Sequence, residues 1–272
     1  MYTINANRLA GPAVVYNGTG NYTAGKYIVP QYLTFHYTVL DYASTIRSFG
    51  PQGPKTASAH LVVSRSGEVT QMVEFNRRAW HAGTSSWNGL NDMNTYSIGI
   101  EVENFGYLHP TPNGGYVSDN HDNVPSDQVI QAKHKNPSCT ANFWQRYTPE
   151  QLNTCEALAV ALTASYGLKG IVGHEDIAPD RKFDPGPAFP MDRMQTAAFG
   201  RDSHVEEGRQ FTVNVPKLNI RTGPGATFPV AGLPLVQGTK VAQLETGSDG
   251  WIKVVALTPG NIQGYVYGAY LI

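Results

Sequence analysis

Alternation of apolar and polar residues marks two strands in the first half of the chain. In YLTFHYT (residues 32–38), Leu, Phe and Tyr alternate with Thr and His, so His36 lies on the polar face. SIGIEVEN (residues 97–104) repeats the pattern, with Glu101 and Glu103 together on its polar face. Both segments are therefore predicted to be strands, each with one apolar and one polar face.

Other segments complete an α/β pattern. SAHLVVSRSGEVTQMVEF predicts a hairpin that turns at Arg65–Glu68. TPEQ (residues 148–151) is a capping box with proline at the first helical position, and Gly167 ends the helix that it begins. LKGIVG then predicts a short strand, and FPMDRMQTAAFG a terminal helix. The predicted fold class is α/β, with a mixed central sheet flanked by helices.

A change in composition divides the chain. GRDSHVEEGRQ (residues 200–210) is polar and has no apolar periodicity, so residues 201–208 are predicted to be a linker. Residues 209–272 contain only short apolar runs punctuated by glycines and prolines, such as LNIRTGPG, GWIKVVAL and GYVYGAYLI. This spacing predicts a small all-β barrel, preceded by an α/β domain at residues 1–200.

Composition and charge limit the classes of function. Hydrophobic residues make up 41% of the 272 residues, which is typical of a folded soluble protein. A formal net charge of −1 gives no reason to expect nucleic acid or an anionic membrane as a partner. The sequence has no run of apolar residues long enough to predict a membrane span. The N-terminal residues lack the pattern of a secretory signal, so any export is expected to use another route.

Residues 105–147 form a long connection that is rich in Asn, His, Pro and Gly. Connections of this length are usually lids, binding loops or disordered segments. The histidines in it have no regular metal-ligand spacing and are expected to be solvent-exposed: His109, His121 and His134.

The two cysteines, Cys139 and Cys155, are too few for a disulfide framework. Cys155 falls on the apolar face of the helix that begins at residue 149. A buried thiol is therefore expected there, with a Cys139–Cys155 disulfide as the alternative.

The most charged stretch of the chain is GHEDIAPDRKFDPG (residues 173–186), which glycines and prolines mark as a loop. A catalytic zinc needs three protein ligands and one open position, and histidine and carboxylate suit it. His36, His174 and Asp184 are candidates. Each also has an ordinary explanation, as a buried structural histidine or a turn aspartate, and spacing alone leaves both interpretations open.

Four motifs, in order along the chain, carry a resemblance: SAHLVVSRSGE, RAWHAG, SIGIEVE and GHEDIAPDRKFDPGPAF. They closely resemble the zinc-dependent N-acetylmuramoyl-L-alanine amidases of the AmpD type, whose superfamily includes phage amidases and animal peptidoglycan-recognition proteins. The resemblance covers most of residues 30–199 and implies a mixed sheet with helices packed on it. It also implies hydrolysis of the amide bond between N-acetylmuramic acid and L-alanine in peptidoglycan.

The resemblance implies a role for each candidate residue. The zinc ligands fall on His36, His174 and Asp184. The catalytic glutamate falls on Glu101, a choice over Glu103 that periodicity cannot make, and the catalytic lysine falls on Lys182. Some members carry a tyrosine where this chain has Ala59, so a tyrosine-assisted mechanism is not expected.

Neighbouring residues are expected to support the site. Tyr37, Trp80 and His81 are expected to line the substrate groove, with core packing as the alternative for Trp80. His60 is expected to be a supporting residue and Glu175 a solvated one. The remaining charged residues of the loop are expected to fix its shape: Asp176, Asp180 and Arg181.

Residues 209–272 resemble bacterial SH3 domains, modules that commonly bind cell-wall material. Together the two resemblances imply a peptidoglycan hydrolase that acts in the wall or periplasm, either a phage lysin or an injected effector with an immunity protein as partner. One alternative is a peptidoglycan receptor without catalysis, which retention of all five functional residues disfavours. Another is a cytoplasmic recycling amidase for soluble muropeptides, for which a wall-binding module has no use.

Overall fold

The computed structural model describes residues 1–199, 210–246, 250–258 and 262–272. The chain divides into two compact units, Met1–Gly200 and Arg201–Ile272. The expected linker, residues 201–208, lies outside the described residues. Among the described helices, none combines the length and hydropathy that a membrane span requires.

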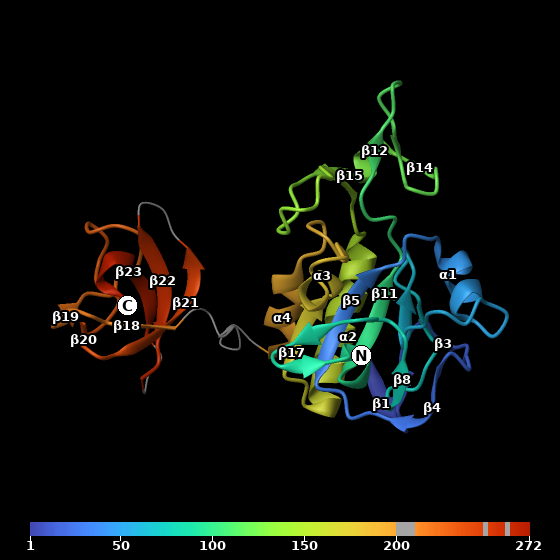
Figure 1. Cartoon of the computed structure of the whole chain (residues 1–272), viewed down its shortest axis with the longest axis horizontal. Helices are drawn as coiled ribbons and strands as arrows, with labels where there is room; N and C mark the ends of the chain where they lie inside the picture. Colours follow the sequence, from blue (N-terminus) through green and yellow to red (C-terminus); the bar gives the residue numbers. More distant parts are fainter. Residues whose placement is uncertain (200–209, 247–249, 259–261) are drawn as a thin grey trace. The chain divides into compact units, whose positions relative to one another are not determined.

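Unit 1 is built on a six-stranded mixed sheet, as the strand patterns predicted (Figure 1). The strand order is β17-β5-β11-β6-β7-β3. Strands β17, β5, β11 and β6 are parallel, β7 forms the predicted hairpin with β6, and β3 runs parallel to β7. The strands are β3 (Val14–Tyr16), β5 (Tyr32–Tyr37), β6 (Leu61–Val63), β7 (Val69–Gln71), β11 (Ser97–Val102) and β17 (Gly170–Gly173).

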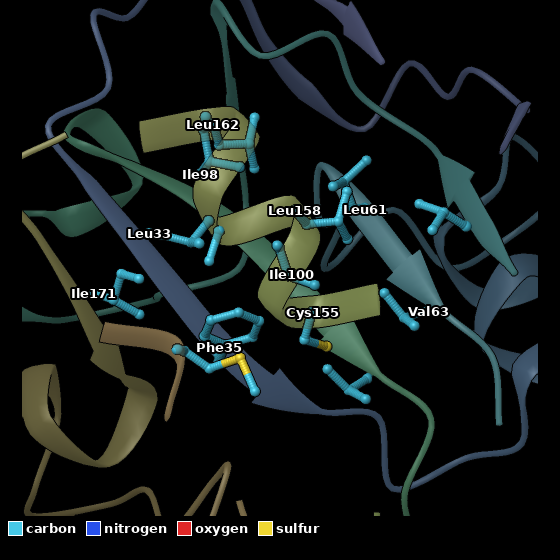
Figure 2. Packing of buried hydrophobic residues seen from close by; sticks show 14 of the residues in the cluster. Leu33, Phe35, Leu61, Val63, Ile98, Ile100, Cys155, Leu158, Leu162 and Ile171 are labelled. Carbon is cyan, nitrogen blue, oxygen red and sulfur yellow. The ribbon is translucent and has the colours of Figure 1, made fainter. Parts of the chain in front are cut away.

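One face of the sheet packs against helix α2 (Pro149–Tyr166), which crosses the strands in Figure 2. The apolar residues of the alternating strands and of α2 meet in one fully buried cluster, which includes Leu33, Phe35, Leu61, Ile98, Ile100, Leu158 and Leu162. Helix α4 (Met191–Phe199) packs beside α2 and adds Met194 to the cluster. The apolar strand faces are thereby used for the core, and the opposite face is left for other groups.

Helix α2 begins and ends as the sequence predicted. The Thr148 hydroxyl accepts from the backbone N–H of Gln151 at 3.1 Å, and the Gln151 side chain accepts from the backbone N–H of Thr148 at 3.0 Å. Gly167 ends the helix in the left-handed region, with φ of 61°, a conformation that costs glycine little. The helix is therefore fixed by local chemistry at both ends as well as by its core contacts.

Cys155 is a free, fully buried thiol on α2, and Cys139 is also free. The expectation of a buried thiol is confirmed, and the disulfide alternative is not. Burial raises the pKa of the Cys155 thiol well above its usual value, which keeps it protonated and unreactive.

Residues 105–147 are more ordered than the sequence predicted. They contain a three-stranded sheet of β12 (His109–Pro110), β13 (Tyr116–Val117) and β14 (Asn123–Val124), labelled at its β12 and β14 strands in Figure 1. A 3₁₀ turn, η2 (Ser126–Gln128), leads to a pairing of β15 (Val129–Gln131) with β16 (Phe143–Gln145). Short backbone pairings within the segment replace the irregular loop that its composition suggested.

Smaller elements border the sheet of unit 1. The strands are β1 (Thr3–Asn5), β2 (Arg8–Ala10), β4 (Tyr22–Tyr27), β8 (Arg77–Ala79), β9 (Ser86–Trp87) and β10 (Leu90–Asn91). The helical pieces are α1 (Tyr42–Phe49), η1 (Met93–Thr95) and the single turn α3 (His174–Ile177).

Unit 2 is all β in its described residues. A four-stranded antiparallel sheet has the order β18-β21-β22-β23, and β19 pairs with β20. The strands are β18 (Gln210–Thr212), β19 (Lys217–Leu218), β20 (Leu235–Val236), β21 (Lys240–Thr246), β22 (Trp251–Ala256) and β23 (Gln263–Tyr267), followed by η3 (Gly268–Tyr270). Val241, Val254 and Val266 are fully buried members of a hydrophobic cluster within this unit. The likeness to bacterial SH3 domains stays a prediction.

Removal of the Thr148 side chain is expected to destabilise unit 1 by about 1–2 kcal/mol. Thr148→Ala loses the cap of α2 and also the hydrogen bond that the hydroxyl donates to the Arg65 carbonyl at 2.7 Å. Thr148→Ser keeps both groups and should unfold in urea at nearly the wild-type midpoint. Equal midpoints for the Ala and Ser variants would show that the cap contributes nothing.

Candidate functional site

Three neighbouring parallel strands end at one edge of the sheet and place titratable residues there. The register sets Glu101 of β11 opposite His36 of β5, and Gly173 of β17 opposite Phe35. His174, which follows Gly173, is therefore level with His36. Since ligand sites in open α/β sheets lie beyond the carboxyl ends of the strands, this edge is the candidate site.

His36, His174 and Asp184, which we call the metal trio, converge at this edge. The Nδ1 atoms of the two histidines lie 2.9 Å apart, and each is 3.0 Å from Oδ2 of Asp184. All three side chains are buried. The backbone N–H of Glu175 donates to the Asp184 carbonyl at 2.8 Å. This bond closes the 174–184 loop and brings its two candidate ligands together.

Hydrogen bonds show which ring nitrogens carry protons. Nε2 of His174 faces the Ala82 carbonyl at 3.1 Å and therefore donates to it. Nε2 of His81 donates in the same way to the Ser97 carbonyl at 3.3 Å. Burial lowers the pKa of His81 well below its usual value, so its Nδ1 is free to accept from Nε2 of His36 at 3.1 Å. Both trio histidines thus direct the lone pair of Nδ1 toward the carboxylate.

Three lone pairs this close repel one another unless a cation lies among them. Burial and the neighbouring His174 lower the pKa of His36 to about 4. Two imidazole nitrogens and one carboxylate oxygen are a donor set that zinc prefers. The residues present therefore fit a metal ion of this kind.

Glu101 and Glu103 share a strand face but differ in surroundings. The two oxygens of Glu103 accept backbone N–H groups, from Tyr42 at 3.0 Å and from Arg65 at 2.7 Å. Glu101 is 8% exposed, and its carboxyl makes no hydrogen bond within the described part of the chain. Burial, reinforced by the charge of Asp184, raises the pKa of Glu101 well above its usual value. Glu101 is thus free to exchange a proton, whereas both carboxylate oxygens of Glu103 are occupied by hydrogen bonds from the backbone.

A pocket of about 410 Å³ opens over these groups. Its wall includes Lys182, Tyr37 and Trp80 as well as the metal trio. The connection at residues 105–147, called the insertion from here on, contributes three residues that the sequence patterns did not single out: Phe105, Tyr107 and Asp119. Their place in the sequence could have predicted this, because the chain that leaves the carboxyl end of β11 must pass this site.

The residues expected to line the groove differ in how they face it. Trp80 is half-buried, and its Nε1 donates to the Thr23 hydroxyl at 3.0 Å, so it both packs and lines the pocket. His81 also reaches the pocket wall, but its ring is buried and is bonded to His36. Substrate contact by Tyr37, Trp80 and His81 stays a prediction.

The expectations for Glu175 and His134 are wrong. Glu175 is 8% exposed rather than solvated, and its carboxylate lies 2.5 Å from Nε2 of His134 and 2.8 Å from Nζ of Lys135. His134 of the insertion is buried as well, and it also donates to the Phe183 carbonyl at 3.1 Å. Each polar group satisfies the other, which permits both to leave water. The insertion thereby stabilises the 174–184 loop, which carries two residues of the metal trio.

Two other charged residues fix the shape of the loop, as expected. The Asp176 carboxylate accepts from the backbone N–H of Gly173 at 2.7 Å. The Arg181 guanidinium donates to the carbonyls of Ala82 at 2.5 Å and Thr84 at 2.6 Å. These bonds tie the loop to β17 and to the RAWHAG segment.

Residues 26–187, more than half of the chain, match the family model of N-acetylmuramoyl-L-alanine amidase. The chain belongs to this amidase family. The 1,6-anhydro-N-acetylmuramyl-L-alanine amidase AmpD of Salmonella typhimurium is 34% identical over 55% of this chain and 60% of its own length. The N-acetylmuramoyl-L-alanine amidase AmiD of Escherichia coli is 29% identical over 62% of this chain and 53% of its own. The chain thus spans less than two thirds of these relatives.

Solved structures of amidases are also similar. AmiD from E. coli in complex with anhydro-N-acetylmuramic acid-L-Ala-D-gamma-Glu-L-Lys is 25% identical, with a TM-score of 0.48 over 73% of this chain and 66% of that one. AmpDh3 from Pseudomonas aeruginosa in complex with anhydromuramic pentapeptide is 27% identical, with a TM-score of 0.47 over 65% and 63%.

Zinc is expected to stabilise this amidase chain through the metal trio. A ligand that binds only the folded state raises its stability, so Zn²⁺ added to metal-free protein should raise the midpoint of thermal unfolding by several degrees in calorimetry. His174→Ala should abolish most of that rise. His109→Ala, which alters an exposed histidine of the insertion, is the control and should keep it. A full zinc-dependent rise in His174→Ala would contradict the assignment of the trio.

Proposed function

We propose that the chain is a zinc-dependent hydrolase of the amide bond between N-acetylmuramic acid and L-alanine in peptidoglycan. One observation carries the proposal: a single pocket contains both the metal trio and Glu101, a nearly buried carboxyl without a hydrogen bond in the described part of the chain. A metal-binding group beside a proton-exchanging group is the minimum for metal-assisted hydrolysis. Membership of the amidase family supports the choice of bond.

Glu101 has the properties of the general acid–base residue. Zinc held by the trio would supply a Lewis acid that activates water near neutral pH. Glu101 takes the proton of the attacking water and then passes it to the leaving amine of L-alanine. Its raised pKa suits the second step, because a carboxyl of ordinary acidity holds a proton too weakly at neutral pH.

Lys182 is placed to meet the charge that develops on the substrate. It lines the same pocket as Glu101, and its charge opposes the rise in the pKa of Glu101. An ammonium group here donates to the carbonyl oxygen of the scissile bond as that oxygen becomes negative. Ala59 is fully buried and offers no proton donor, which leaves this role to Lys182.

A receptor without catalysis is the alternative from another class. Binding alone gives no reason to bury a carboxyl without a partner, because desolvation of a polar group costs free energy that no contact here returns. Glu101 is such a group. Its retention next to the complete metal trio favours an enzyme.

Two sizes of substrate are compatible with this chemistry. Curated relatives are named for 1,6-anhydro-N-acetylmuramyl-L-alanine, a small muramyl compound, which favours a recycling amidase. Unit 2 is a separate all-β body that contains none of the catalytic groups, which favours a polymer held by a second module. We propose that the substrate is the intact wall. The protein would then act either as a phage lysin or as an injected effector, whose partner would be an immunity protein.

Glu101→Gln is expected to keep zinc and to lose amidase activity by about a hundredfold or more, as removal of a general base requires. Glu103→Gln is the matched control on the same strand face. It should lower stability through its bonds to Tyr42 and Arg65 but leave the rate per folded molecule nearly unchanged. Muropeptide hydrolysis measured by chromatography, with metal analysis of each variant, decides the question. An active Glu101→Gln together with an inactive Glu103→Gln would reverse the assignment.

Lys182→Ala should also keep zinc and should lose about a hundredfold in kcat, because the developing charge loses its partner. Arg181→Ala removes a neighbouring cation that is bonded to backbone carbonyls. We expect this control to affect zinc retention and stability more than kcat. An unchanged kcat in Lys182→Ala would remove the lysine from the mechanism.

Truncation after unit 1 tests whether unit 1 catalyses hydrolysis while unit 2 holds the polymer. A second module raises turnover on a polymer through effective concentration. The 1–200 fragment, which has its own core, should therefore cleave a small soluble muropeptide at the rate of the full chain but release less product from sacculi. Equal activity on sacculi with and without unit 2 would support the small-substrate alternative instead.

A further inference from the structure

We propose that the segment His81–Ala82, fixed by the side chain of Asn94, is the positioning element that holds both histidines of the metal trio in binding geometry. The inference rests on the zinc site of the proposed function. It gives His81 a role different from the groove lining that the sequence suggested, and it gives a role to Asn94, which no sequence motif singled out.

Two adjacent residues contact both trio histidines. The His81 ring accepts from Nε2 of His36 at 3.1 Å, and the Ala82 carbonyl accepts from Nε2 of His174 at 3.1 Å. Each bond engages the nitrogen that points away from the trio. It therefore keeps the other nitrogen, Nδ1, unprotonated and directed at the metal position.

Asn94 fixes the backbone of the His81–Ala82 segment. Its Oδ1 accepts the backbone N–H of His81 at 2.9 Å and that of Ala82 at 2.7 Å. The Asn94 side chain is 4% exposed and comes from η1, directly before β11. One buried acceptor thus orients two successive peptide groups, and with them both contacts to the trio.

The His81 ring is also located by β11. Its Nε2 donates to the Ser97 carbonyl at 3.3 Å. The ring packs on Gly99, where an added Cβ would lie well inside van der Waals distance of the ring atoms. No other residue fits at Gly99 without displacing His81. Strand β11 therefore provides both the platform for this ring and, at Glu101, the proposed acid–base group.

The energetic expectation follows from the role of such partners in metal sites. A histidine whose second nitrogen has no partner can rotate, and it can place its proton on the ligating nitrogen. Loss of a partner of this kind typically lowers metal affinity by about 10–100-fold. Both trio histidines depend on one segment, so a change at Asn94 is expected to act on both.

Zinc affinity of the full-length protein tests the proposal without reference to turnover. The dissociation constant is measured on metal-free protein by competition with a chromogenic chelator, and calorimetry confirms that each variant is folded. His81→Leu and Asn94→Leu should each weaken zinc binding by about 10–100-fold. The matched control is Gln71→Leu. Gln71 of β7 is also fully buried, and its side chain bonds to backbone groups of residues 7, 9 and 73 rather than to the trio or to His81. This variant should bind zinc nearly as wild type does.

Conservative variants separate positioning from general damage. His81→Asn offers a side-chain oxygen near the place of Nδ1 and should recover most of the affinity that His81→Leu loses. Asn94→Asp keeps an acceptor for both backbone N–H groups and should do the same relative to Asn94→Leu. The double variant with leucine at both positions should lose less than the product of the two single effects, because both act through one segment.

Three outcomes would overturn the proposal: wild-type affinity in folded His81→Leu and Asn94→Leu, an equal loss in Gln71→Leu, or no recovery in either conservative variant. Failure of the zinc site itself gives a different result. In that case wild-type protein does not compete with the chelator, and its affinity does not change in His174→Ala.

Discussion

The arrangement of unit 1 depends on one constraint: the three electron-pair donors of the metal trio converge in a buried place. Two histidine nitrogens and a carboxylate oxygen lie 2.9–3.0 Å apart, a separation at which they repel one another without a cation. The chain must therefore hold them by other means until a metal binds. The strand register sets the level of the two histidines, and the Glu175–Asp184 backbone bond closes the loop that carries the third ligand.

The insertion at residues 105–147 contributes to the same constraint. Its short pairings hold residues 134–136 against the ligand loop, where Asn136 donates to the Pro179 carbonyl at 2.5 Å and His134 pairs with Glu175. Its first residues also enter the pocket wall. A segment that composition marks as irregular thus shapes both the rigidity of the loop and the opening above it.

Sequence patterns predicted the parts of the structure that depend on local chemistry. The caps of α2 and the alternating strands β5 and β11 follow from residues close together in the chain. The His134–Glu175 pair joins residues 41 positions apart, and no periodicity reports such a contact. Glu101 and Glu103 share a face in the pattern, and only the approach of the Tyr42 and Arg65 backbone to Glu103 separates them.

Sequence patterns also do not predict the direction of a side chain in an irregular segment. RAWHAG carries the family resemblance, yet its histidine could have faced substrate or metal ligand. The structure turns His81 to His36 because Ser97, Gly99 and Asn94 surround it, and all three come from the SIGIEVEN strand or the turn before it. Two motifs that were separate in the sequence form one support in the fold.

The most direct test of the account is a titration of the metal-free full-length chain with zinc while the release of new amino termini from muropeptide is followed and the freed residue is identified. The account predicts no release without metal, a linear rise that saturates at one zinc per chain, and L-alanine as the new amino terminus. Release that is independent of zinc, or a new terminus on any other residue of the peptide, would contradict it.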